Sequence, residues 1–352
     1  MVPLLMLIPV SGTVSIADEK GMQDFIGAKG VISTERLAEL STRRNWPGLV
    51  QLAGHFGAIA ATSWGLSVSW GSWWSMPLFI LQGILLNYLY APTHECDHLT
   101  AFKSRWLNIW VARLCGFVIF NPSDHHRWTH FVHHRNTQDW QKDTELERPE
   151  IRSAGQYLLA LSGFPLIRSK LKRIWCHAFI SADEWYLTPS QQQDVKQAAR
   201  WHVTGYAVAL GSALVLQSWW VLVFWWGPFF LMRWSYMLQG LGEHTGLTHQ
   251  PHTLWNTRTF STNWFMRWVN WNMTYHCVHH TFPGVPFYRL PTLHREVEQQ
   301  LGYALPSTSY TKLHWRQFWA FREGRTELDI CTEHENQLIA VGRLTGFPSK
   351  QA

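Results

Sequence analysis

The sequence predicts an all-α integral membrane protein, with four transmembrane helices in two hairpins and a cytoplasmic helical cap that holds a histidine-rich site for two metal ions. Three observations support this fold class. Charged residues make up 15% of the chain, against about a quarter in an ordinary soluble protein. The 352 residues include 23 tryptophans, a residue enriched at membrane interfaces. Many of the 19 histidines gather in three short clusters.

Two long windows supply the predicted membrane spans. Lys and Arg are absent from Leu49 to Phe102, and no charged residue occurs from Trp201 to Met232. About 20 helical residues cross the hydrocarbon of a bilayer. The mean hydropathy of −0.15 is low because histidine-rich polar segments dilute these windows. We therefore expect spans at about residues 49–67, 72–90, 201–218 and 219–237.

The turns of the two hairpins orient the chain. The turns "WGSW" and "QSWW" are rich in Trp and contain no Lys or Arg, whereas the long polar segments carry "STRRNW", "RSKLKRIW" and "FREGR". Cytoplasmic loops are enriched in Lys and Arg, so the polar segments and every histidine cluster are expected on the cytoplasmic side of the inner (plasma) membrane. The alternative is a soluble helical protein that buries its Trp-rich helices.

We divide the chain into a cytoplasmic lead-in (1–48), a membrane domain (49–294) and a cytoplasmic, helical tail (295–352). Ser33 is expected to cap a short helix, and Thr188 with Pro189 to begin a helix that runs into the third span. The segment "RWLNIWVARLCGFVIF" is expected to lie along the membrane surface. The opening "MVPLLMLIPV" lacks a basic start and is too short to span, so we do not interpret it as a signal peptide.

The histidine clusters have the spacing of helical metal ligands. "HFVHH" and "HCVHH" each place imidazoles at i, i+3 and i+4, on one face of a helix, and "HECDH" places two imidazoles one turn apart. Two hairpins that return to the same side would bring the clusters together. Eight imidazoles exceed the ligands of one ion, so two metal ions are expected. These residues are His94, His98, His130, His133, His134, His276, His279 and His280.

Redox-active iron is the favoured metal. Imidazole suits iron, copper, nickel and zinc, but the ligand set is richer than that of a three-histidine hydrolytic zinc site. The five cysteines are scattered without a CxxC pair, which argues against disulfides, zinc ribbons and a built-in iron–sulfur module. Nearby carboxylates could accept hydrogen bonds from the ligands or could simply be solvated; they are Glu95, Asp97, Asp143, Glu145 and Glu243.

The remaining histidines fall into two groups. Five flank the clusters and are weaker candidates for ligands or their supports, namely His125, His126, His249, His252 and His294. Five others are isolated and are expected to be ordinary histidines, namely His55, His177, His202, His314 and His334.

Three segments resemble the histidine boxes of the membrane fatty acid desaturase and hydroxylase superfamily. They are "HECDHLTAFKSRWLN", "HFVHHRNTQDWQKDTELE" and the region around "NMTYHCVHHTFPGVPFYRLPTLH". The resemblance covers most of Arg43 to His294. It implies a non-haem di-iron centre that activates O₂, held by the eight box histidines and a ninth, His244 in "GEHTG". Two departures, Val278 where many relatives have Glu and the three-residue spacing of the first box, weaken an assignment to ordinary fatty acyl chains.

The expected function is O₂-dependent desaturation or hydroxylation of an unactivated C–H bond in a lipid-like or small hydrophobic substrate. The alternatives are a monooxygenase of the alkane or carotenoid-ring type and, outside enzymes, a transition-metal transporter, which should carry ionisable residues within its spans. The reaction needs electrons, ultimately from NAD(P)H. Since no haem or iron–sulfur pattern occurs, a separate ferredoxin or rubredoxin with its reductase is expected. The net charge of +6 fits anionic lipid head groups better than nucleic acid.

Overall fold

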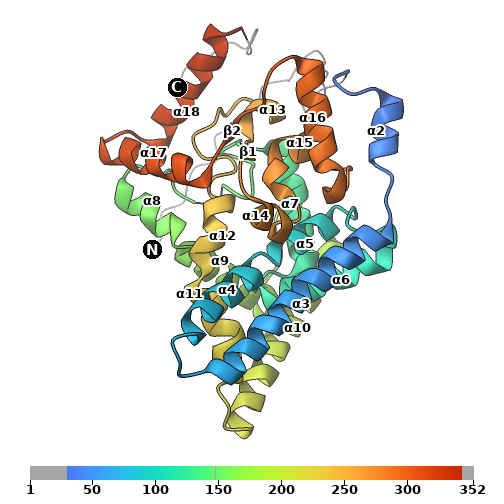
Figure 1. The fold of residues 1–352 in the computed structure, drawn as a ribbon, viewed down its shortest axis with the longest axis vertical. Helices are drawn as coiled ribbons and strands as arrows, with labels where there is room; N and C mark the ends of the chain where they lie inside the picture. Colours follow the sequence, from blue (N-terminus) through green and yellow to red (C-terminus); the bar gives the residue numbers. More distant parts are fainter. Residues whose placement is uncertain (1–29, 147, 343–352) are drawn as a thin grey trace.

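The computed structural model describes residues 30–146 and 148–342, and there the chain is mainly helical. The one strand pairing in this part joins β1 (Thr259–Phe260) to β2 (Ser307–Thr308) in parallel. The all-α expectation is therefore confirmed for the described residues. Figure 1 shows two regions, with long helices tapering downward and shorter helices gathered above them.

The tapering region consists of two helical pairs. Helix α3 (Asn45–Ser69) packs against α4 (Ser75–Asn87), and α4 packs in turn against α11 (Gly227–Leu231). Helix α10 (Pro189–Val215) leads into the π-helical turn η1 (Val221–Trp226), which continues into α11. The pairs approach closely at Gly83, where a Cβ atom would lie 2.5 Å from the carbonyl oxygen of Pro228.

The predicted spans correspond only in part to helices. Residues 49–67 lie within α3, and most of 201–218 lies within α10. Span 72–90 is shorter than expected, because α4 ends at Asn87. Span 219–237 is divided among η1, α11 and α12 (Arg233–Gly240); Pro228 cannot donate a backbone hydrogen bond, so regular α-helix does not run through this segment. Within the described residues, no helix combines the length with the mean hydropathy required of a membrane span.

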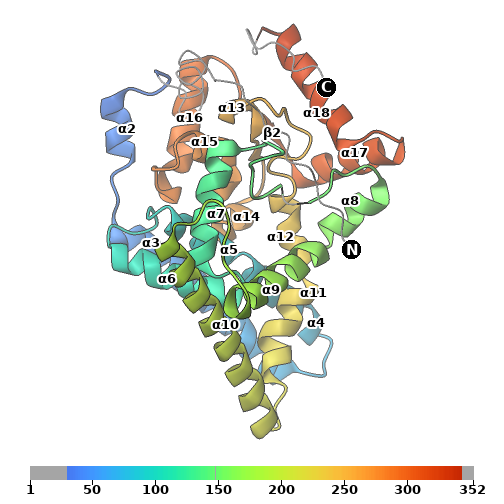
Figure 2. The ribbon, with the colours of Figure 1, turned by 180° about the vertical axis from the view of Figure 1, so that it is seen from behind.

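The upper region carries the three histidine clusters. Their helices are α5 (Tyr90–Asp97), α7 (Ser123–Asn136) and α15 (His276–Thr281). Helix α6 (Arg105–Val118), the segment expected at the membrane surface, packs against α5 and α7. Figure 2 shows α9 (Phe164–Phe179) and α10 on the same side as α7. The remaining elements here are α8 (Ala154–Leu161), α13 (Thr253–Asn256), α14 (Trp264–Val269), η2 (Met273–Tyr275) and η3 (Phe287–Arg289).

The predicted helix starts are confirmed by their caps. The Ser33 hydroxyl accepts a hydrogen bond from the Arg36 N–H at the start of α2 (Thr34–Leu40). Thr188 and Gln191 form a capping box that starts α10 at Pro189. The opening apolar stretch lies outside the described residues.

The tail is helical, as expected, in α16 (Leu290–Leu301), α17 (Tyr310–Arg322) and α18 (Glu327–Ala340). Helix α16 runs across the expected domain boundary at residues 294 and 295 and contacts α15. Helix α18 reaches the loop after α12, where Glu335 accepts hydrogen bonds from Thr248 and Gln250. Through α16, the start of the tail packs directly against α15, the helix that carries the third histidine cluster.

Candidate metal centre

The histidine helices adopt the geometry that their spacing predicts. In α7 the i, i+3 and i+4 positions turn His130, His133 and His134 towards the interior, where each is buried. Helix α15 has only six residues, and its three histidines are also buried. The chain enters α15 through Trp271 and Asn272, both at positive φ, so a tight turn precedes the third cluster.

All nine histidines expected to be ligands converge in two adjoining groups. In the first group, possible ligand atoms from α5, α7 and α15 lie within 4.8 Å of one another. The second group combines α7, α15 and the segment after α12, and His276 joins it through His244 and Glu243. The first group consists of His94, His98, His130, His134 and His279, and the second of His133, His244 and His280, with His276 as the ninth histidine beside His244.

Many ring nitrogens in these groups are buried without a hydrogen-bond partner. Among the described residues this holds for both ring nitrogens of His94 and His279 and for one nitrogen on six other members: His98, His133, His134, His244, His276 and His280. An unpaired buried polar group costs about 1–3 kcal/mol, so several unpaired ring nitrogens within one site require an explanation. Coordinated metal ions would satisfy these atoms, and the donor set therefore fits the metal pair that the sequence implies.

Eight of the nine histidines, all except His133, favour neutral imidazole, which is the metal-binding form. Burial, reinforced by the neighbouring imidazoles, holds the pKa of His94, His130, His134, His276, His279 and His280 well below the usual value. Burial also lowers the pKa of His98 and of His244 to about 3. These rings can therefore offer lone pairs to a cation at neutral pH.

Two of the predicted carboxylates support imidazoles directly. Asp143 Oδ1 lies 2.8 Å from His133 Nδ1, and Glu145 Oε1 lies 2.8 Å from His130 Nδ1. Burial alone would lower the pKa of His133, but the charges of Asp143, Glu145 and Glu243 outweigh it and raise this pKa to about 9. Each carboxylate accepts from Nδ1 and leaves Nε2 of the same ring to bind a metal.

A third carboxylate, Glu243, lies among the histidines. Its Oε1 is 3.5 Å from His276 Nδ1 and accepts a hydrogen bond from the Gln239 side-chain amide. Burial raises its pKa to about 8. Since Glu243, His244 and His276 bring possible ligand atoms within 4.8 Å of one another, Glu243 is placed to act as a ligand itself.

Glu95 and Asp97 do not contact the expected ligands as proposed. Glu95 Oε1 accepts a hydrogen bond from the backbone N–H of Phe287, which lies in the proline-rich arm that follows α15, residues 282–294. Consecutive helical residues point about 100° apart, which turns Glu95 away from the face of His94. Asp97 Oδ2 instead lies 2.6 Å from Nδ1 of His126, one of the flanking histidines.

Three further residues contact the histidines and were not predicted from the sequence. The Tyr90 hydroxyl lies 3.2 Å from His126 Nε2, and its ring lies beside His94 with centroids 5.7 Å apart. Thr137 Oγ1 is 3.2 Å from His280 Nδ1, and the Asn256 carbonyl oxygen is 3.0 Å from His244 Nδ1. Thr137 follows His134 by three residues, so helical spacing could have indicated it. Tyr90 and Asn256 carry no comparable signal.

The flanking histidines have different surroundings. His126 stacks on His130 with centroids 5.3 Å apart, and His249 bonds to Trp140 and to the Gln138 carbonyl. His294 lies 3.5 Å from Glu298, and His252 is the cap residue before α13. His125 lies with His177 and Glu184 in a separate cluster. His177 is therefore not the isolated residue that we expected.

The other isolated histidines make ordinary contacts. A ring nitrogen of each of three residues lies within hydrogen-bond distance of a backbone carbonyl oxygen: His55, His202 and His314. His334 accepts a hydrogen bond from the Thr248 N–H.

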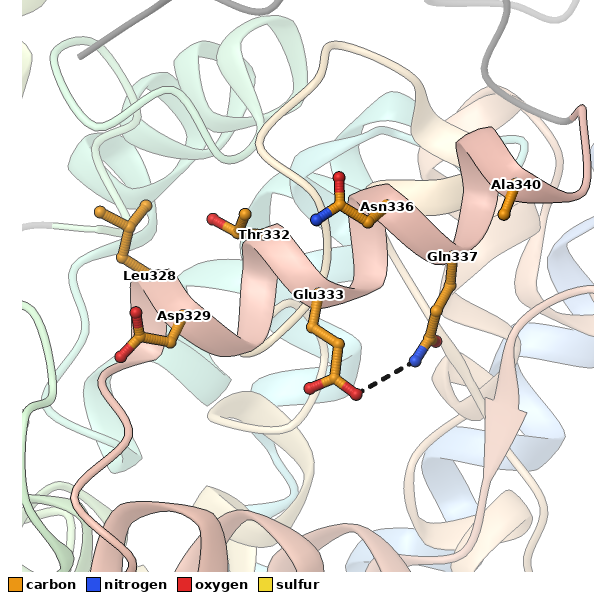
Figure 3. A pocket seen from close by; sticks show the side chains of 7 residues that line it. All are labelled: Leu328, Asp329, Thr332, Glu333, Asn336, Gln337 and Ala340. Carbon is orange, nitrogen blue, oxygen red and sulfur yellow. Dashed lines mark hydrogen bonds between the residues drawn. The ribbon is translucent and has the colours of Figure 1, made fainter.

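A surface pocket lies outside the histidine groups. Figure 3 shows the seven side chains that line it, all from α18, with Glu333 bonded to Gln337. None of the seven belongs to a group of possible metal ligands in the described part of the chain. We assign no function to it.

The fold and site define a helical protein with a buried polyhistidine centre supported by carboxylates. The chain belongs to the fatty acid desaturase family, whose sequence model matches residues 34–312. It is similar to an sn-1 acyl-lipid omega-3 desaturase (ferredoxin) of Nostoc sp. (strain 36), with 23% identity over 230 residues, 62% of this chain and 54% of the relative.

Two further relatives show the range of the similarity. An sn-1 oleoyl-lipid 12-desaturase of Anabaena variabilis is 25% identical over 251 residues, 68% of this chain and 59% of the relative. A fatty acid conjugase of Calendula officinalis is 25% identical over 285 residues, 71% of this chain and 74% of the relative. The chain thus spans a little over half the length of the two cyanobacterial relatives.

Proposed function

We propose that this protein is an O₂-dependent oxidoreductase of membranes that desaturates a lipid-like substrate at a pair of iron ions. The convergence of nine histidines, with buried ring nitrogens that lack partners, carries the proposal. A centre rich in neutral imidazole suits iron. The names of the relatives, two desaturases and a conjugase, favour desaturation over hydroxylation.

The two histidine groups would each hold one iron ion, with Glu243 available as a carboxylate ligand in the second group. When bound, the ions would supply the one-electron chemistry that O₂ activation and cleavage of an unactivated C–H bond require. Asp143 and Glu145 hold their imidazoles by Nδ1, while Thr137 and the Asn256 carbonyl hold His280 and His244. These contacts fix the ring orientations before a metal arrives.

The surface of the tapering region supports a membrane location. Trp70, Trp73 and Trp74 at the first hairpin turn and Trp219 at the second are exposed, as are large apolar side chains along α3 and α10. Exposed apolar faces of this kind are expected to contact lipid. We propose a multi-pass protein of the inner membrane, with the histidine groups on the cytoplasmic side.

An external reductant is part of the proposal. Desaturation removes two electrons from the substrate, while reduction of O₂ to two molecules of water takes four. The other two must come from outside, and the word ferredoxin in a relative's name favours such a carrier, fed by NAD(P)H through a reductase.

A continuous set of contacts connects the surface to the second group. The partly exposed Trp140 donates from Nε1 to His249 Nε2 at 3.0 Å, and His249 Nδ1 lies 2.9 Å from the Gln138 carbonyl oxygen. The Gln138 side-chain amide donates to the backbone oxygen of His244 at 2.6 Å. We propose that the carrier delivers electrons at this face.

The function is tested by reconstitution. The purified, iron-loaded protein would be incubated with acyl lipids, O₂, NAD(P)H, ferredoxin and ferredoxin reductase, and the products identified by mass. A product lighter than the substrate by two hydrogen atoms supports desaturation. A product heavier by one oxygen atom would mean that the enzyme hydroxylates its substrate instead. A protein that binds no iron, or oxidises no lipid although iron-loaded and reduced, would contradict the proposal.

A further inference from the structure

A second, separate set of metal-ligating side chains lies between α7, α9 and the loop before α10. Possible ligand atoms of His125, His177 and Glu184 lie within 4.8 Å of one another. His125 comes from the first turn of α7, His177 from the last turn of α9 and Glu184 from the following loop. None of the three belongs to the two groups of the proposed iron centre.

Both imidazoles direct Nε2 at the same carboxylate oxygen. His177 Nε2 lies 2.5 Å, and His125 Nε2 3.4 Å, from Glu184 Oε1, and the ring centroids are 4.6 Å apart. The histidines are 4% and 5% exposed. A hydrogen bond to Glu184 accounts for His177, and His125 Nε2 also lies 3.1 Å from the Tyr186 hydroxyl, so the two imidazoles alone do not require a metal ion.

The other oxygen of Glu184 provides an independent observation. Oε2 is buried, and no hydrogen-bond partner for it exists within residues 30–146 and 148–342. A carboxylate oxygen in that position costs free energy unless a cation or a donor binds it. Two nitrogen atoms and one carboxylate form the donor set of His₂Glu zinc sites, in which solvent completes a four-coordinate ion.

Solvent has access to this cluster. A surface pocket of about 470 Å³ is lined by His177 and Glu184 and can supply the fourth ligand. Its lining includes two basic side chains, Lys172 and Arg173, and two acidic ones, Asp183 and Glu184. The pocket is therefore not strongly cationic, and a divalent ion could enter.

We propose that His125, His177 and Glu184 bind a single divalent transition-metal ion of the zinc type, distinct from the iron centre. The ion would fix the first turn of α7 to the end of α9. Because α7 also carries His130, His133 and His134, this link would help to hold those histidines in place. The inference does not depend on the proposed oxidase function.

The test titrates Zn²⁺ alone into the full-length, iron-loaded protein in detergent, with bound metals counted by mass spectrometry. Relative to the wild type, Glu184→Gln and His177→Gln should each lose one zinc per chain, or bind it at least about tenfold more weakly, and keep their iron. The double variant should lose no more zinc than either single variant. His294→Ala, which removes a His–Glu pair without a third ligand, should retain full zinc content.

A second readout guards against variants that fold poorly. Co²⁺ bound by the wild type should show the visible absorption of a four-coordinate ion, and one equivalent of Zn²⁺ should remove it. Zinc content and affinity equal to wild type in well-folded Glu184→Gln and His177→Gln would overturn the proposal. So would a wild-type cobalt spectrum without four-coordinate character.

Discussion

The imidazoles of His134 and His280 stack with centroids 4.1 Å apart and an interplanar angle of 14°. They come from the second and third histidine clusters and belong to different groups of possible ligands. The stacked pair therefore lies where the two groups adjoin. A change on either side of this contact should affect both proposed iron positions, which makes ligand substitution informative.

Replacement of His279 tests the ligand assignment. His279→Ala removes a fully buried imidazole of the first group, so the variant should bind less iron and lose turnover by about a hundredfold or more. Iron per chain and product formation are measured together. His314→Gln serves as the control, because His314 belongs to neither histidine group and is hydrogen-bonded to the Tyr157 hydroxyl and the Leu238 carbonyl oxygen. Full iron content in His279→Ala would remove His279 from the ligand set.

Asp143 should set the metal affinity through His133. Asp143→Asn keeps the size of the side chain but removes the charge that supports the imidazole, so iron affinity should fall by about 10–100-fold. Competition with a chelator measures this change. Glu150→Gln is a suitable control, since Glu150 is paired with Arg152 outside the site. Equal affinity in Asp143→Asn and the wild type would mean that the contact only stabilises the fold.

Cysteine labelling tests the membrane orientation. Ser72 in the first hairpin turn and Ser169 in α9 are both exposed, so each position can react if reagent reaches it. A membrane-impermeant maleimide added to intact cells should label Ser72→Cys and leave Ser169→Cys unlabelled. Both should react after lysis. Labelling of Ser169→Cys alone in intact cells would reverse the orientation.

Trp140 should matter for reduction by the protein carrier and not for the metal site. Trp140→Leu should slow oxidation of reduced ferredoxin, measured by stopped flow, and weaken ferredoxin binding to the metal-free chain. Reduction by dithionite should be unchanged. Trp315→Leu on α17 also removes an exposed indole and should have no effect. Equal ferredoxin kinetics in both variants would place electron entry elsewhere.

Gly83 should be intolerant of a side chain. A Cβ atom there would meet the Pro228 carbonyl oxygen and the Met232 side chain, so Gly83→Ala should destabilise by about 1–3 kcal/mol. Gly57 in α3 has no atom within 4 Å of the corresponding position. Gly57→Ala should be neutral or stabilising by up to about 1 kcal/mol, because Ala favours helix over Gly. Thermal unfolding in detergent compares the two.

Local spacing was sufficient to predict much of the site. The HxxHH patterns indicated which histidines share a helix face, and Ser33 and Thr188 indicated helix starts, because these features depend on residues within one or two turns. The fourth predicted span shows the limit of the same reasoning. An apolar composition does not reveal that Pro228 and the π-helical turn divide the segment into short helices.

The sequence by itself determined that the chain is mainly helical, that its histidines form metal-ligand patterns and to which family it is related. Only the tertiary structure decided how the histidines divide into two groups, that Glu95 holds the proline-rich arm, and that His177 meets His125 and Glu184. The physical reason is that helical periodicity acts within a few residues. The partners across helices depend instead on how distant segments pack, and no short pattern encodes that packing.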